Sequence, residues 1–178
     1  MIPQNHINLF HICRNLIFLA LLFTASSCFS VKYSTTGAAI SPDLKTISVL
    51  YFSNRSATAP PNLARDFTEK LRNKCLSNTR LTMIVDGGDA SFEGDITGWE
   101  VTNGSLQSGD KPSTNRFTIT VHVKFTNSAE PKFNYDTSFS EHQDFPSSQD
   151  ISAVSNDLTT KISDLLLEDI FNKAFANW

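Results

Sequence analysis

The residue with the clearest capacity for covalent chemistry is Cys28. It follows a single cation, Arg14, an uninterrupted apolar run over residues 16–23 and small residues at 24–27. A run of about eight apolar residues makes only about 12 Å of helix, well short of the roughly 30 Å hydrocarbon core of a bilayer. The run is therefore typical of a secretory signal and not of a membrane span. A cysteine placed directly after such a signal is a candidate for covalent modification of its thiol.

The residues Ala25-Ser26-Ser27-Cys28 resemble a bacterial lipobox, although Ala25 stands where leucine is commoner. In a lipobox the small residues let a peptidase cut before the cysteine, which then carries diacylglycerol and an N-terminal acyl chain. Such chains, at about 0.8 kcal/mol per buried CH2, anchor a protein firmly. We therefore expect a lipoprotein signal peptide over residues 1–27, lipidation of Cys28 and a flexible tether over residues 28–43. The alternative is an ordinary signal cut near Ala25, which leaves Cys28 a free thiol.

The remaining candidates for catalysis or metal binding form no recognisable site in the sequence. His122 and His142 are the only histidines after the signal, and neither has a ligand partner three or four residues away. Asp86 and Asp89 flank a glycine turn, where carboxylates commonly form the turn itself. The sequence has no nucleophile elbow, phosphate-binding loop or dinucleotide fingerprint. We expect no enzyme, no cofactor and no metal, with a hydrolase of envelope glycans or lipids as the alternative.

Cations gather on the polar side of two expected strands. Arg116, His122 and Lys124 lie on one face of the first strand, and Lys132 is expected on the next. Together they could form a weakly basic patch that contacts phosphates or carboxylates. The alternative is an ordinary solvated sheet face with its usual complement of cations.

The length and net charge of the chain restrict its domain number and its possible functions. Removal of residues 1–27 leaves 151 of the 178 residues, the size of one domain with its own core, which we place at residues 44–178. Arg14 is the only charged residue removed, so 14 basic residues remain against 18 acidic, a net charge of −4. This charge does not indicate a nucleic-acid binder. Cys75 has no partner for a disulfide and is expected to be a small buried hydrophobe.

Alternating apolar and polar residues predict the strands. The clearest case is residues 116–126, and residues 46–52 are apolar on both faces, which indicates an interior strand. In residues 90–101, Gly94 and Gly98 favour a bulge or a close backbone approach, and Trp99 faces inward only if a bulge occurs near Gly98. Shorter strands are expected over residues 81–85 and 132–139, and a long loop over 102–115. The expected inward residues of the 116–126 and 132–139 strands are Phe117, Ile119, Val121, Val123, Phe125, Phe133, Tyr135 and Phe139.

Two amphipathic helices complete the pattern. Pro60-Pro61 opens the first, of about sixteen residues. Its buried stripe is Leu63, Phe67, Leu71 and Cys75, and that of the final helix is Ile151, Val154, Leu158, Ile162, Leu165, Ile170, Ala174 and Trp178. The order β-α-β-β-β-β-α predicts an α+β two-layer sandwich, with a mixed or antiparallel sheet of about four to five strands and both helices on one face. The other face is left open to solvent or a partner.

The chain resembles the LptE-like family of lipopolysaccharide-assembly outer-membrane lipoproteins, in its Bacteroidetes-type form. No single motif is diagnostic, and the resemblance rests on the order and spacing of segments across most of the mature chain. These segments are Cys28, residues 33–38 (YSTTGA), 47–56 (ISVLYFSNRS), 67–69 (FTE), 92–98 (FEGDITG), 117–125 and 169–178 (DIFNKAFANW).

The resemblance implies a non-enzymatic plug and assembly partner of the LptD-type β-barrel, through which lipopolysaccharide passes to the cell surface. The lipid anchor would hold it at the outer membrane, and the absence of an acidic run after Cys28 favours the periplasmic side. The basic lipopolysaccharide-contacting residues of distant relatives do not align here, so Arg116, His122, Lys124 and Lys132 are candidates from the pattern alone. A pilotin-like or adaptor lipoprotein of another envelope machine is the alternative.

Overall fold

The computed structural model describes residues 40–103 and 114–175. The expected signal peptide, Cys28, most of the tether and Trp178 lie outside these residues. The elements, in chain order, are β1 (Thr46–Val49), β2 (Ser53–Asn54), α2 (Leu63–Asn78), β3 (Thr82–Ile84), β4 (Ala90–Asn103), β5 (Thr114–Asn127), the 3-10 helix η1 (Pro131–Phe133), β6 (Tyr135–Pro146) and α3 (Ile151–Phe175).

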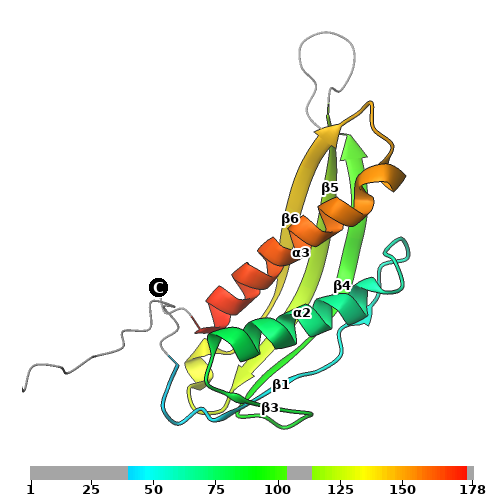
Figure 1. The fold of residues 1–178 in the computed structure, drawn as a ribbon. Helices are drawn as coiled ribbons and strands as arrows, with labels where there is room; N and C mark the ends of the chain where they lie inside the picture. Colours follow the sequence, from blue (N-terminus) through cyan, green and yellow to red (C-terminus); the bar gives the residue numbers. More distant parts are fainter. Residues whose placement is uncertain (1–39, 104–113, 176–178) are drawn as a thin grey trace, which may run out of the picture. The chain divides into compact units, whose positions relative to one another are not determined.

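The described elements form two layers, with both helices on the same face of one sheet (Figure 1). The strand order is β3-β1-β4-β5-β6, with the short β2 also paired to β4. β1 runs parallel to β3 and β4, whereas β4, β5 and β6 form an antiparallel meander. The expected α+β sandwich with a mixed sheet is confirmed. The sheet has six strands, because β2 adds a two-residue pairing that the sequence did not reveal.

β5 supplies the centre of the core. Its five alternate apolar residues are at most 1 % exposed, as the strict alternation predicts: Phe117, Ile119, Val121, Val123 and Phe125. Strand β4 pairs with it along nearly its whole length, and the register shifts between Ile96 and Gly98. This bulge turns Trp99 toward the helices, where its ring meets the edge of Phe117 at 4.8 Å between centroids.

The helices also follow their periodicity. Helix α2 spans 16 residues, and its expected stripe from Leu63 to Cys75 is buried. Before α3, Asp150 Oδ1 accepts a hydrogen bond from the Ser152 N–H at 2.8 Å, which caps one of the free donors of the first turn. The expected stripe of α3 is wrong at Leu165, which is 41 % exposed. Leu166 is buried instead, because it continues the four-residue spacing of Leu158 and Ile162.

The first strand ends earlier than expected. β1 stops at Val49, and Tyr51 is 58 % exposed, although Phe52 is fully buried. Side chains of α2 replace the strand ladder here. The Arg72 guanidinium donates to the Val49 carbonyl at 2.8 and 3.2 Å, and the Phe52 N–H donates to the Thr68 hydroxyl at 3.1 Å. With these backbone groups satisfied, no continued pairing is needed.

Two further boundaries differ from the expected ones. The last strand was expected over residues 132–139 but spans Tyr135–Pro146, because Pro131 begins a 3-10 turn that includes Phe133. The expected loop over 102–115 is shorter, since β4 reaches Asn103 and β5 begins at Thr114. Residues 104–113 lie outside the described part of the chain.

Residues 85–89 connect β3 to β4 and must cross β1, which lies between these two strands. Gly87 has φ +72°, a backbone conformation that favours glycine. At Gly88, an added Cβ would lie 2.6 Å from the Ser48 backbone nitrogen, so the crossing needs a residue without a side chain. The crossing buries Ser48 completely, and Ser48 Oγ accepts a hydrogen bond from the Gly88 N–H at 3.3 Å.

Candidate functional site

The face of the sheet opposite the helices is the surface on which the sequence placed its candidate residues. Along β4, β5 and β6, outward side chains alternate with the buried ones in matched register. They are almost all charged or hydroxylated: Glu93, Asp95, Glu100, Arg116, Thr118, Thr120, His122, Lys124, Asp136, Ser138, Ser140, His142 and Asp144. We call this set the open face. Its chemistry is that of a polar contact surface.

Three of the four predicted cations lie on the open face, and each has a carboxylate partner. Lys124 Nζ lies 2.6 Å from Glu93 Oε1, which raises the lysine pKa through that hydrogen bond. His122 Nε2 lies 2.7 Å from Asp136 Oδ1. These ion pairs are exposed to solvent, so each adds little to stability. Their effect is to place a carboxylate beside each of these two side chains.

Arg116 forms the best-defined pair on the open face. Its guanidinium makes two hydrogen bonds to the Asp144 carboxylate, at 2.8 and 3.1 Å, across β5 and β6. The bond from Arg116 holds the pKa of Asp144 below its usual value. Arg116 stands eight residues from Lys124 on the same strand, roughly 26 Å at about 3.3 Å per residue. It therefore does not share a site with Lys124.

The sequence predicted Lys132 on the neighbouring strand, and this prediction is wrong. It lies in the 3-10 turn η1, since Pro131 delays the start of β6. Its ammonium is 4.7 Å from the centroid of the Phe133 ring and 3.6 Å from Glu130 Oε1. The structure thus places His122 and Lys124 at neighbouring outward positions of β5, with Arg116 farther along the same strand and Lys132 in the η1 turn. The outward residues of β4–β6 also include five carboxylates, which outnumber the cations: Glu93, Asp95, Glu100, Asp136 and Asp144.

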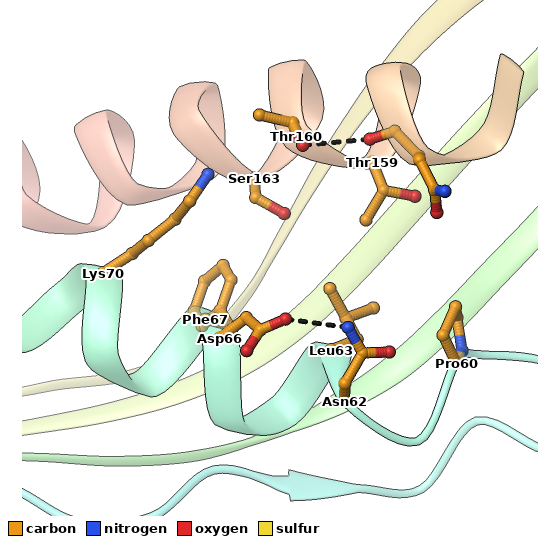
Figure 2. A pocket seen from close by; sticks show the side chains of 10 residues that line it. Pro60, Asn62, Leu63, Asp66, Phe67, Lys70, Thr159, Thr160 and Ser163 are labelled. Carbon is orange, nitrogen blue, oxygen red and sulfur yellow. Dashed lines mark hydrogen bonds between the residues drawn. The ribbon is translucent and has the colours of Figure 1, made fainter.

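A cleft between the two helices is a second candidate site, and the sequence analysis missed it (Figure 2). It has a volume of about 430 Å³. Lys70 Nζ contacts Asp164 Oδ1 at 2.7 Å and joins the two helices at the cleft. The lining residues are Pro60, Asn62, Leu63, Asp66, Phe67 and Lys70 from α2 and the segment before it, and Asn156, Thr159, Thr160 and Ser163 from α3.

Most charged and polar groups of the cleft already have partners. Asp66 accepts hydrogen bonds from Asn62 at 2.8 Å and from Arg65 at 3.1 Å, and these bonds lower its pKa. Thr159 Oγ1 accepts a bond of 3.4 Å from the Trp99 indole N–H. Ser163 differs, because its hydroxyl has no hydrogen-bond partner among the residues of 40–103 and 114–175. Although the residue as a whole is only 3 % exposed, the oxygen itself is accessible from the cleft, since no fully buried side-chain oxygen or nitrogen of these residues lacks a partner. Figure 2 shows this hydroxyl pointing into the gap between the helices.

The sequence did contain a sign of the cleft. Asn156, Thr159, Thr160 and Ser163 recur at spacings of three and four, which places them on one face of α3. This polar face runs beside the buried apolar stripe, where a helix packed tightly against α2 would carry apolar residues. Polar residues are common on helices, however, and only the position of α2 shows that these line a gap.

The cleft does not resemble a hydrolase site. Asp66 is its only carboxylate, whereas a pair would be needed for acid and base roles. Asp164 and Glu168 do border a shallow hollow of about 370 Å³ beside β6, but both are exposed and Asp164 is already paired with Lys70. The described residues contain no group of three or more His, Cys, Asp or Glu side chains that could hold a metal. In the same part of the chain, neither helix is long and apolar enough to cross a membrane.

The described part of the chain is a small two-layer α+β domain with one helix-covered and one polar open sheet face. The model of the LptE family, described as lipopolysaccharide-assembly, matches residues 44–174. The chain therefore belongs to the LptE family, a family of non-catalytic outer-membrane lipoproteins. A comparison with curated proteins gave no significant match.

Three solved structures show how far the fold is shared. The hypothetical protein CT253 from Chlamydia trachomatis matches with a TM-score of 0.53 and 13 % identity, over 75 % of this chain and 99 % of that one. A minor lipoprotein from Acinetobacter baumannii matches at 0.46 and 12 % identity, over 71 % and 89 % of the two chains. Rare lipoprotein B from Shewanella oneidensis matches at 0.43 and 15 %, over 70 % and 89 %. Only the first is close enough in shape to support the fold.

Proposed function

We propose that this protein is a lipid-anchored plug and assembly partner of an LptD-type outer-membrane β-barrel, working as lipopolysaccharide passes to the cell surface. The observation that carries the proposal is the match of the lipopolysaccharide-assembly family over residues 44–174, which includes every described strand. The open face supplies the contact surface. It is the side of the sheet that neither helix covers (Figure 1).

The chemistry of the open face suits a polar barrel wall. The lumen of a transmembrane β-barrel is polar, and burying a lone charge against it would be costly. Here the charges of Arg116 and Lys124 are each matched by a carboxylate, His122 lies beside Asp136, and hydroxyls such as Ser138 lie between them. Docking this face therefore keeps the Arg116 and Lys124 charges paired. In this arrangement His122, Lys124 and Arg116 contact the barrel or its lipopolysaccharide cargo, and Lys132 does so from the η1 turn.

The lipid anchor would keep the domain beside its partner. Lipidation at Cys28 fixes one end of the tether over residues 28–43 in the membrane. A flexible chain of about 16 residues spans roughly 20–24 Å on average. Confinement to that distance raises the effective concentration of the domain at the barrel, so an interface of moderate affinity persists.

Site-specific photo-crosslinking tests which face meets the barrel. A photoreactive amino acid in place of Ser138 samples the open face, and the same amino acid in place of Glu168 on α3 is the matched exposed control. The proposal predicts a covalent adduct with one large barrel protein from position 138 and none from position 168. An adduct from position 168 alone would show that the helix layer, and not the open face, meets the barrel.

Depletion separates this proposal from an adaptor role in another envelope machine. Loss of the protein should reduce lipopolysaccharide at the cell surface, because the barrel would no longer assemble correctly. An adaptor would instead be required for a secreted or fibre-forming product. Unchanged surface lipopolysaccharide together with loss of such a product would support the adaptor and contradict the proposal.

A further inference from the structure

We propose that the cleft between α2 and α3 binds a neutral saccharide of one or two rings. The cleft lies on the helix layer, and the proposal does not depend on the barrel partnership of the open face. Its volume of about 430 Å³ falls within the range typical of small-molecule sites. Three features select the ligand: paired charges, free hydroxyl and amide groups, and an apolar wall.

The charges in the cleft argue against an ionic ligand. Lys70 is held by Asp164 at 2.7 Å, so its ammonium is not free to bind a phosphate. Asp66 carries a negative charge that would repel an anion, and it is itself held by Asn62 and Arg65. A cationic ligand would compete with the Arg65 guanidinium, which already pairs with the same carboxylate. A neutral ligand with hydrogen-bonding groups is not repelled by Asp66 and does not compete with Arg65 for that carboxylate.

The polar groups left in the cleft suit a polyhydroxylated ligand. The Ser163 hydroxyl can donate and accept, and it has no partner among the described residues although its side chain is almost wholly buried. Thr159 accepts from Trp99 and retains its own hydroxyl proton for donation. The Asn62 side chain donates to Asp66 through nitrogen, which leaves its carbonyl oxygen as an acceptor. These groups lie on α3 and on the residue that precedes α2, and they face the same gap (Figure 2).

The third feature is the apolar part of the wall. Pro60, Leu63 and Phe67 border the cleft beside the polar groups. Leu63 and Phe67 are only 5 % and 1 % exposed, so Pro60 offers most of the apolar surface that a ligand can reach. A sugar ring has C–H faces as well as hydroxyls, so it can meet both kinds of surface at once. The Ser163 oxygen is itself accessible from the cleft, because no side-chain oxygen or nitrogen that is fully buried among the described residues lacks a partner. A ligand in the cleft could therefore accept or donate a hydrogen bond at this hydroxyl.

The test is a titration of the full lipidated chain in detergent micelles, without any barrel. The probes are two neutral disaccharides, chitobiose and maltose, which distinguish an amino-sugar source from a hexose source, together with glucose 1-phosphate. The readouts are the dissociation constant and the NMR signal of the Trp99 indole N–H, which donates to Thr159. We expect at least one neutral disaccharide to bind and to shift this signal, and the phosphorylated sugar to bind more weakly.

Ser163→Ala is the decisive variant, and Ser155→Ala on the same helix, which does not line the cleft, is its matched control. Loss of one hydrogen bond should weaken disaccharide binding about tenfold in Ser163→Ala and leave Ser155→Ala unchanged. Ser163→Ala should keep the melting temperature of the wild type, because it removes a hydroxyl that bonds to no described residue and is accessible from the cleft, so lost binding cannot reflect unfolding. Ser163→Leu, which fills the cleft, should abolish binding.

Several results would overturn the proposal. These are the absence of binding by both neutral disaccharides, equally tight binding of the phosphorylated sugar, unchanged affinity in Ser163→Ala, or a response to a neutral hydroxylated peptide but to neither sugar. None of these results bears on the barrel partnership, because no barrel is present in the titration. A failed crosslink from the open face would likewise leave this proposal standing.

Discussion

The ring of Phe52 packs directly against Gly94 on the helix-facing side of the sheet. A Cβ added to Gly94 would lie 2.7 Å from Phe52 Cε1 and would also collide with the His122 carbonyl oxygen. Phe52 is fully buried and is 5.4 Å from the ring of Phe67 on α2. The missing side chain at Gly94 therefore makes room for the residue that joins the segment after β1 to both the sheet and the helix.

Gly94→Ala should destabilise the protein by roughly 1–3 kcal/mol, the usual cost of overpacking a tight core. The reason is that neither the Phe52 ring nor the β5 backbone can move away without disturbing its own contacts. Urea unfolding at pH 7 measures the effect. Gly98→Ala is the control, since its Cβ would meet the Thr120 side chain at 3.1 Å, a milder contact. A loss in Gly94→Ala no greater than that in Gly98→Ala would contradict the packing described.

Asp89 should make stability depend on pH. Its Oδ2 accepts hydrogen bonds from the Thr46 hydroxyl at 2.8 Å and from the Thr46 and Lys45 N–H groups at 2.9 and 3.1 Å. These bonds, led by that of the Thr46 side chain, lower the pKa of Asp89 from its ordinary value of 3.8. A lowered folded-state pKa means that the stabilisation is fully present above the ordinary value and is lost as the pH falls through the folded-state value.

The corresponding variant is Asp89→Asn, which cannot ionise. Its stability deficit relative to the wild type should be largest at pH 7 and should shrink toward pH 3, as measured by chemical denaturation at several pH values. Asp86→Asn in the same turn is the control, because Asp86 accepts a bond from the adjacent Gly87 N–H only at the surface. A deficit in Asp89→Asn that stays constant from pH 7 to pH 3 would contradict the linkage.

The Cys75 thiol should be inert in the folded protein. It is fully buried, and burial raises its pKa to about 12, so almost no reactive thiolate exists at pH 8. N-ethylmaleimide should leave Cys75 unmodified in the native protein and alkylate it fully in denaturant, as seen by mass spectrometry. Rapid labelling under native conditions would mean that the interface of α2 with the sheet opens readily.

Cys28→Ala should leave the domain folded and change only its location. The substitution removes the proposed lipid attachment point and touches none of the described core. Fractionation should find the variant away from the outer membrane, while its circular dichroism spectrum and melting temperature match those of the wild type. Unchanged residence in the outer membrane would contradict lipidation at this residue.

The parts of the fold that follow from local periodicity could be predicted from the sequence. Five consecutive alternations from Phe117 to Phe125 left one choice for the buried face of β5. The four-residue spacing from Leu63 to Cys75 did the same for α2. Gly98 indicated a possible position for the bulge that turns Trp99 inward. Each of these signals is carried by neighbouring residues, so no knowledge of distant contacts is needed.

The features that depend on distant partners could not be predicted. β1 ends where it does because Arg72 and Thr68, on a later helix, satisfy its backbone groups. The carboxylate partners of Arg116 and Lys124 come from neighbouring strands whose register is not visible in the sequence. The cleft is a gap between two helices, and no single segment encodes it. Periodicity thus predicted which face of a helix or strand is buried. Contacts between elements determined where the strands end and where the candidate sites lie.

Affinity purification of the tagged protein from outer membranes is the most direct test of its proposed role. In a detergent that preserves other barrel complexes, the account predicts that one very large barrel protein is recovered with it in comparable amount. Recovery of the lipoprotein without any barrel, while a control barrel complex survives the same detergent, would contradict the account.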